Sequence, residues 1–258
     1  MTQYLFSQFR ANEFETLHRE LFKVFDIQQA KLQSLYENMR TEFEVDGFPP
    51  ERMLPRSIFR SYDPNFQKRY DEALVIGIDI PSIIEKNNGI LEKKTIVILA
   101  QDPLRPISER IEAIGIGTPY SLHAKSCREK GRSSFYFELI KVLLDEGYRI
   151  YLTDIIKIWV SDREPSKDKG IRLSKQDENR FIQILKAEVE IFEPLGIITW
   201  GKKARDTVSG LELGVRHLEF PHPSGSNNGA WHKLIGKSPT RQNKIEFWSQ
   251  KVSDYLAE

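Results

Sequence analysis

The sequence contains a single cysteine, Cys127, and no long hydrophobic run. One cysteine excludes an intramolecular disulfide framework, a four-cysteine zinc site and an iron–sulfur cluster held by several cysteines of this chain. The most apolar stretches, KKTIVILA and EALVIGIDIP, are far shorter than the roughly 20 residues that a membrane-spanning helix needs. We therefore expect a globular, monomeric protein without a membrane anchor, whose thiol lies in the reducing cytoplasm.

An excess of charge of one sign is also absent. The 38 Lys and Arg residues nearly balance the 37 Asp and Glu residues, and the formal net charge is +1 at pH 7. With 40% hydrophobic residues over 258 positions, this composition is typical of a folded chain and not of a disordered tail. Basic residues gather in two local clusters that predict contacts with phosphates, although the first is equally consistent with a solvated loop: Lys125, Arg128, Lys130 and Arg132, then Lys233, Lys237, Arg241 and Lys244.

Hydrophobic periodicity divides the chain into two parts. Apolar residues recur every three or four positions over 12–40, which predicts a helix, and residues 41–70 are broken by Gly and Pro into an irregular connector. The apolar run over 73–80 is consistent with either a strand or a short buried helix. We therefore divide the chain into a mainly helical N-terminal extension, residues 1–91, packed on an α/β domain, residues 92–258.

The second part alternates short apolar runs with amphipathic stretches. Such alternation predicts α/β architecture, in which helical crossovers join parallel strands. The expected strands are 96–100, 149–155, 196–200 and 216–220. The expected helices are 134–146, a helix opened by Ser174 with Asp177 and ending before Pro194, 201–209 and 240–256.

Two segments directly after predicted strands carry reactive side chains. The strand 96–100 leads into Gln101, Asp102 and Pro103, and the strand 216–220 leads into a His-Pro-Ser sequence that begins at His222. In open α/β sheets, ligands bind beyond the carboxyl ends of the strands. Taken singly, Asp-Pro is more often an ordinary turn and His-Pro-Ser an ordinary loop; their joint position favours a functional site.

These segments resemble the uracil-DNA glycosylase superfamily, in which a Gly-Gln-Asp-Pro-type turn holds a catalytic Asp and a His-Pro-Ser-type loop holds a catalytic His. The similarity covers about residues 92–236 and includes AIGIGTPYSL, TDIIK and ITWGKKA in matching order. It implies a three-layer α/β/α sandwich around a central four-stranded parallel sheet. It also implies a monofunctional glycosylase that hydrolyses the bond between deoxyribose and uracil or another modified base in DNA, without metal or cofactor.

The same resemblance assigns roles to individual residues. Asp102 corresponds to the carboxylate that positions water, and His222 corresponds to the group that stabilises the leaving base. The remaining assignments follow the family in the same way: Gln101, Tyr120 as stacking platform and Asp154 for the base, and Ser224, Ser226 and Asn227 for phosphates.

Three departures from the family pattern affect substrate choice. Leu104 stands where well-known members exclude thymine with a Tyr, and Asp154 stands where the family usually has Asn. An ionised Asp only accepts hydrogen bonds, so it opposes uracil reading unless it is protonated, turned away or facing an amino group; alternatively it is a helix cap or an ion-paired carboxylate. The loop after His222 lacks an apolar wedge, which favours single-stranded or damaged DNA as substrate.

The alternative is that the chain is a non-catalytic or weakly catalytic nucleobase-binding or nucleic-acid-binding protein of the same fold.

Overall fold

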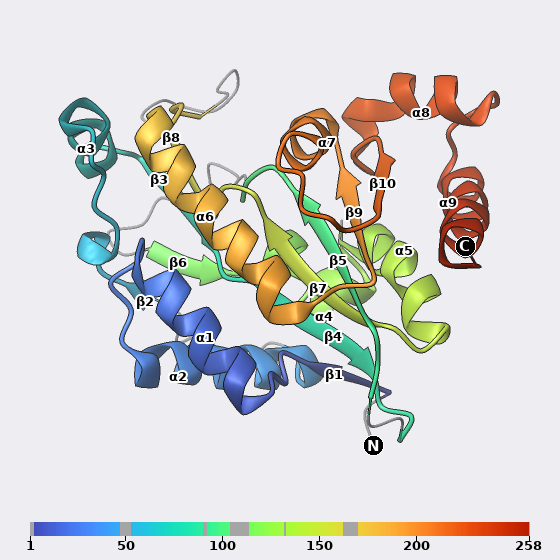
Figure 1. Cartoon of the computed structure of the whole chain (residues 1–258), viewed down its shortest axis with the longest axis horizontal. Coiled ribbons are helices and arrows are strands. Elements are labelled where there is room, and N and C mark those ends of the chain that lie inside the picture. The colour runs from blue at the N-terminus through green and yellow to red at the C-terminus, as the bar shows by residue number, and fades with distance from the viewer. Residues whose placement is uncertain are drawn as a thin grey trace.

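Two β-sheets organise the protein (Figure 1). The computed structural model describes residues 3–46, 53–89, 92–103, 114–131, 133–161 and 170–257. The larger sheet has six strands in the order β1 (Tyr4–Phe6), β4 (Ser82–Lys86), β7 (Arg149–Asp154), β5 (Thr95–Ala100), β9 (Gly196–Trp200) and β10 (His217–Phe220). Its four strands β7, β5, β9 and β10 are parallel and coincide with the four strands predicted from the sequence.

The sheet is larger and more mixed than predicted. Strands β1 and β4 from the N-terminal part extend it, and each pairs in the antiparallel direction. The prediction of a purely four-stranded parallel sheet is therefore wrong in its extent. The apolar residues of β4 fill the edge beside β7, because Ile83 and Ile84 are fully buried and pair with Tyr151 and Ile150.

A second sheet has the order β2 (Met53–Leu54), β6 (Ile114–Gly117), β3 (Val75–Asp79) and β8 (Ile158–Ser161). The ambiguous run 73–80 is therefore a strand, β3, whose residues are all buried. Its last residue, Asp79, pairs with Gly117 of β6 and donates its main-chain N–H to the carbonyl of Lys157. The second sheet thus brings a carboxylate from the N-terminal part next to the turn that follows β7.

Helices cover both faces of the larger sheet. Every residue of β7 is buried, and side chains of a strand alternate between faces. Thr153 bonds to Glu188 of α6 (Lys175–Phe192), so α6 lies on one face, in front of the sheet in Figure 1, and α5 (Ser134–Asp145) lies behind it. The other helices of the C-terminal part are α4 (Lys125–Glu129), α7 (Lys202–Ser209), α8 (Asn228–Ile235) and α9 (Arg241–Ala257), with short 3-10 turns at Pro119–Ser121 and Gly225–Asn227.

The predicted helix 12–40 is two helices, α1 (Ala11–Phe22) and α2 (Gln29–Glu44). Between them the chain turns so that Phe25 and Ile27 enter the core, and Phe25 forms a β-bridge with Phe59. Because the apolar spacing continues through the break between α1 and α2, the sequence pattern did not reveal the break. The connector also contains a 3-10 turn, Arg56–Ile58, and α3 (Pro64–Asp71), which Asp63 caps by accepting from two main-chain N–H groups.

The N-terminal part and the α/β part share one continuous buried core. A buried ion pair at the amino end of β7 also joins them, since Arg149 donates to the Glu13 carboxylate of α1 at 2.5 and 2.7 Å.

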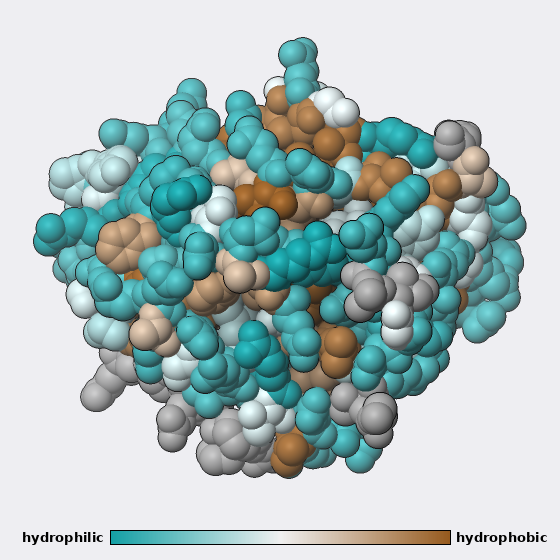
Figure 2. Space-filling view, turned by 60° about the horizontal axis from the view of Figure 1, so that its bottom comes forward, coloured by the Kyte–Doolittle hydropathy of each residue, from teal (hydrophilic) through white to brown (hydrophobic). Residues whose placement is uncertain are grey.

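On the face that Figure 2 presents, hydrophilic residues predominate and hydrophobic patches interrupt them without merging into one band. Within the described residues, no helix has the length and hydrophobicity that crossing a bilayer requires.

Candidate functional site

The carboxyl ends of β5, β7, β9 and β10 meet at one edge of the sheet. The crossover after β5 runs through α5 on one face, and the crossover after β7 runs through α6 on the other. Strands β5 and β9 therefore form a topological switch point, where α/β sheets open a crevice for ligands. Asp102 follows β5 and Gly201 follows β9, so the Asp-Pro turn lies beside this crevice.

Tyr120 forms the centre of the site. Its ring stacks on Tyr136 of α5, with centroids 4.2 Å apart and planes 17° apart, and meets the buried Trp200 edgewise at 5.1 Å. Its backbone has φ +61°, a left-handed conformation that is uncommon for a residue other than glycine. The hydroxyl is buried and has no hydrogen-bond partner within the described part of the chain. One ring face of Tyr120 is thus covered by protein, and its polar end is unsatisfied.

Three carboxylates surround this tyrosine. Burial raises the pKa of Tyr120 well above its usual value, and the charges of Asp154, Asp79 and Asp102 raise it further. Asp102 and Asp154 were predicted to belong to the site, and Asp79 was not, because it lies outside the segment that resembles a known family. An aspartate inside the otherwise apolar run 73–80 was the available signal.

Asp154 ends β7 and is 4% exposed. Its main-chain carbonyl accepts a hydrogen bond from the ammonium of Lys157 at 2.9 Å, and Lys157 forms a buried ion pair with Glu188 of α6 at 3.0 Å. Ile155 and Ile156 donate their N–H groups to the carbonyls of Ala100 and Gln101. The turn that carries Asp154 is therefore fixed to both β5 and α6.

Asp102 is half-buried next to a cavity of about 380 Å³ that Gln101, Ile156 and Lys203 also line. Burial raises the pKa of Asp102 above its usual value, and the hydrogen bond from the Gln101 amide, at 2.6 Å, opposes that rise. This carboxylate meets solvent at the crevice and accepts protons more readily than an ordinary Asp. Leu104, the predicted steric residue, lies outside the described residues.

His222 lies 6.1 Å from Tyr120 and 5.8 Å from Tyr136, measured between ring centroids. Burial lowers its pKa to about 4, so the imidazole is neutral at pH 7. The main-chain N–H of Ser224 donates to Nδ1 at 3.2 Å. Because Nδ1 accepts, the ring proton of the neutral imidazole lies on Nε2, where it is available as a hydrogen-bond donor.

The loop after His222 is held by hydrogen bonds among its own side chains and by α8 and α9. Ser224 Oγ lies 2.9 Å from Nδ1 of His222 and 2.9 Å from Ser226 Oγ, and the Asn227 amide donates to both hydroxyls. Trp231 of α8 donates to the carbonyl of His222 at 3.0 Å. The three residues predicted to bind phosphate therefore form one polar cluster beside the imidazole.

The glycine between β9 and α7 is required by its backbone. Gly201 has φ +100°, which side chains other than glycine's rarely adopt, and a Cβ there would touch the Cβ of His222 at 3.5 Å. Replacing Gly201 would therefore strain the turn that contacts His222.

Several residues of the two predicted basic clusters make contacts within the protein. Arg128 and Lys244 are buried, at 6% and 4% exposure, and Arg132 lies outside the described residues. Lys244 donates to the carbonyl of Pro223 and to Asn228, so it supports the His222 loop from α9, and Arg241 pairs with Glu138. Arg128, Lys244 and Arg241 are therefore engaged in contacts within the protein.

A groove of about 510 Å³ lies between α7 and α8, where Pro221 and Asn227 on either side of His222 also line it. Lys202, Arg205, Lys233 and Asn227 are among its lining residues. Arg205 pairs with Asp206 and Glu219, whereas within the described residues Lys202 and Lys233 have no carboxylate partner. Sequence reasoning missed Lys202, although it follows the strand 196–200 at the same edge as the other site residues.

No protein-family model matches the chain. No curated protein matches it either. Within the described residues, no three His, Cys, Asp or Glu side chains form a group that would hold a metal ion. The site is therefore interpreted from its own geometry: a neutral imidazole donor, a half-buried carboxylate and an aromatic face at one edge of the sheet.

Proposed function

We propose that the protein hydrolyses the N-glycosidic bond of uracil or another modified base in DNA. The observation that supports this most directly is the position of His222, which lies beside Tyr120 with its Nδ1 occupied by Ser224 and, within the described residues, no hydrogen-bond partner at Nε2. A departing base carries negative charge. A neutral N–H group that is held in place stabilises that charge by donating a hydrogen bond. The basis for DNA as substrate is the resemblance of the sequence motifs together with the lysines near this loop.

Asp102 and His222 divide the work of bond cleavage in this proposal. As the bond from C1′ to the base breaks, its electron pair leaves with the base and positive charge develops on the sugar. The Asp102 carboxylate stabilises that charge and orients a water, which adds to C1′ through its oxygen and transfers a proton to Asp102. His222 donates from Nε2 to an oxygen of the departing base. The flipped base stacks on Tyr120, which offsets part of the few kcal/mol needed to remove it from its neighbours.

Incubation with defined oligonucleotides tests the proposal. Single- and double-stranded DNA carrying uracil, hypoxanthine, xanthine or only normal bases is treated with alkali, and strand cleavage reports abasic sites. We expect release of at least one modified base and faster release from single strands, because the loop after His222 has no apolar wedge. If no base is released, but the protein binds these oligonucleotides and Tyr120→Ala weakens that binding, the protein is instead a nucleobase-binding protein.

Asp154→Asn should increase the rate of uracil release about 10-fold, because one added hydrogen bond in the transition state corresponds to about that factor in rate. The amide would accept from uracil N3 and donate to O4, whereas the carboxylate only accepts. Asp79→Asn is the matched control, because it neutralises another carboxylate near Tyr120 without placing an amide at the base-reading position. Initial rates on single-stranded uracil DNA provide the measurement. Equal rates in wild type and Asp154→Asn would show that Asp154 does not read the base.

Replacing both Lys202 and Lys233 with alanine should weaken DNA binding for all sequences alike. Each cation that contacts a phosphate contributes about 0.7 to the slope of log K against log salt concentration for a single strand, so the slope should fall by about 1.4. Lys237→Ala is the control, since the Lys237 ammonium already pairs with Glu246. Fluorescence anisotropy over a salt series measures the slopes. An unchanged slope in the double variant would remove the groove from the DNA path.

A further inference from the structure

Tyr120 and Ser121 form a strained pair in the backbone. Their φ angles are +61° and +52°, and neither residue is a glycine. Left-handed conformations of such residues persist only where surrounding contacts determine them. Within the segment, Ser121 N–H donates to Thr118 at 2.9 Å, Ala124 N–H donates to Ser121 at 3.1 Å, and Thr118 Oγ1 lies 2.9 Å from His123 Nδ1. These bonds lie within the turn. Tyr136, Trp200 and His222 contact the Tyr120 ring from the α/β part, and a further attachment joins the turn to the N-terminal part.

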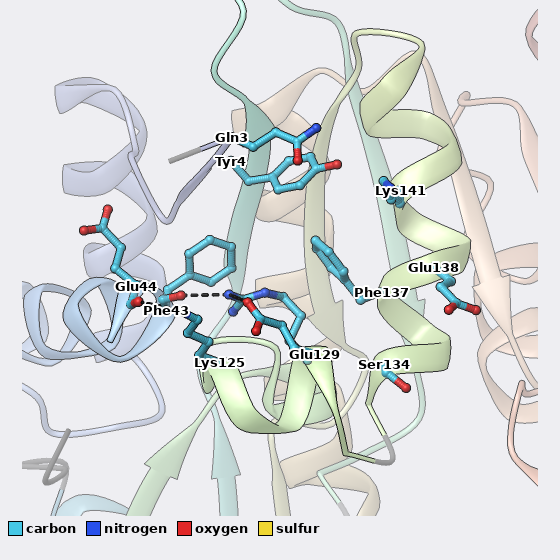
Figure 3. Close-up of a pocket in the computed structure, with 11 residues that line it drawn as sticks. Gln3, Tyr4, Phe43, Glu44, Lys125, Glu129, Ser134, Phe137, Glu138 and Lys141 are labelled. Atoms are coloured by element: carbon cyan, nitrogen blue, oxygen red, sulfur yellow. Dashed lines mark hydrogen bonds and ion pairs between the residues drawn. The ribbon is translucent and has the colours of Figure 1, made fainter. Parts of the chain in front are cut away.

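Arg128 provides the attachment to the N-terminal part. Its guanidinium donates to the carbonyl of Leu122 at 3.1 Å and to the carbonyl of Phe43 at 2.7 Å, and it lies 3.6 Å above the Phe43 ring. Leu122 is the residue after the strained pair, and Phe43 lies in the last turn of α2. Arg128 and Phe43 line a cavity of about 440 Å³, and Figure 3 shows Phe43 there beside Glu44 and Lys125 at the end of α2. One buried side chain therefore joins the Tyr120 turn to the N-terminal extension.

The end of α2 is suited to this contact. The last carbonyls of a helix have no partner within the helix and carry partial negative charge, which attracts cations. Arg128 binds the carbonyl of Phe43, Lys125 binds the carbonyl of Glu44 at 3.2 Å, and the Glu42 carboxylate lies 3.9 Å from Nε2 of His123. Phe43 in turn stacks on Phe6 of β1, with ring centroids 5.0 Å apart. The end of α2 is thus anchored to the sheet as well as to the Tyr120 turn.

We propose that Arg128 and the last turn of α2 (Glu42, Phe43 and Glu44) form a clamp that positions Tyr120 for base stacking. In this inference, which rests on the proposed function of Tyr120, Arg128 is a positioning residue and does not touch substrate. The clamp holds the left-handed turn between α2 and the site, so that the Tyr120 ring is fixed against Tyr136 before a base arrives. It also gives the N-terminal extension a role in the activity.

A double-mutant cycle separates positioning from general stability. Arg128→Met should lower kcat/KM for the released base by roughly 10- to 100-fold, the cost of a misplaced binding group. Because the effect acts through Tyr120, the same substitution in a Tyr120→Ala background should cost less than about 3-fold. Equal losses in both backgrounds would overturn the clamp.

Arg149→Met is the matched control. Arg149 is also buried and also joins the extension to the sheet, but it lies at the amino end of β7, away from the site. It should leave kcat/KM within about 3-fold at a temperature where the protein is folded, even though Glu13 loses its partner. If Arg128→Met does not fold, Arg128→Lys replaces it, because one ammonium cannot reach both carbonyls in the manner of a guanidinium.

Hydrogen exchange tests the clamp without any substrate. In Arg128→Met the amides of Ser121 and Ala124 should exchange at least about 10-fold faster, while those of β5 are unchanged. Arg149→Met should not accelerate Ser121 or Ala124. If wild-type protein releases no base, the proposed function fails and this experiment still decides whether the clamp holds the turn. Unchanged exchange at Ser121 and Ala124 in Arg128→Met would overturn it.

Discussion

Replacing Asp102 with asparagine should lower the rate of base release by about 10² to 10⁴ while the protein stays folded. The asparagine side chain has nearly the same shape, but it carries no charge to stabilise the sugar and is a poor acceptor for the proton of water. The half-buried position of Asp102 enlarges the effect, because electrostatic interactions are stronger where water is partly excluded. Single-turnover rates with the best substrate of the oligonucleotide series measure it.

The pH dependence of the rate provides an independent check on Asp102. Burial raises its pKa, so the ionised form is lost at a higher pH than for an ordinary Asp. The rate of the wild type should therefore fall on the acid side with a midpoint above 3.8, the ordinary Asp value. In Asp102→Asn the contribution of this carboxylate to the fall should be absent, which leaves the contribution of His222, whose pKa is about 4.

Asp79→Asn serves as the matched control for the Asp102 rate, since Asp79 also lies near Tyr120. It should cost less than about 10-fold, because it is not positioned at the sugar in this mechanism. A full wild-type rate in Asp102→Asn would remove Asp102 from the chemistry.

The parallel strands β5, β7 and β9 were predictable because they are buried on both faces. Runs such as 96–100 and 196–200 are continuously apolar and bounded by residues that end a strand, and the structure places β5 and β9 there. The break between α1 and α2 was not predictable from spacing, because Phe25 and Ile27 preserve the apolar pattern while the chain turns toward Phe59. The strands β1 and β4 were missed because they pair with an edge that only the folded sheet creates.

The candidate site was predictable in its outline and not in its surroundings. Asp102, Tyr120 and Asp154 come together because Asp154 ends β7, Asp102 follows β5 at the same edge of the larger sheet, and Tyr120 follows β6 of the second sheet. Asp79 reaches them through the second sheet, whose pairing is long-range and leaves no local pattern. Similarly, Arg128 was expected in a phosphate-binding cluster. Its burial under α2 could not be predicted, because that burial depends on a contact between residues 85 positions apart in the sequence.

Replacing His222 with alanine should lower the rate of base release by about 10² to 10³, the usual cost of removing one donor to a developing negative charge. The imidazole acts in its neutral form, because burial lowers its pKa to about 4 and Ser224 N–H occupies Nδ1. Ser224→Ala is the matched control: it removes the hydroxyl near Nδ1 but retains the main-chain donor that fixes the tautomer. Its cost should be less than about 10-fold.

The depressed pKa of His222 also predicts the direction of a change in stability. The unfolded chain binds a proton at His222 near pH 6.5, whereas the folded protein does so only near pH 4. The contribution of neutral His222 to stability is therefore complete above about pH 6.5 and is lost as the pH falls toward 4. Denaturant titrations over this range should show a steeper loss of unfolding free energy in wild type than in His222→Ala. Equal slopes, or a rate that falls as His222 titrates near pH 6.5, would mean that the imidazole is not held neutral by the fold and does not act as the donor assigned to it.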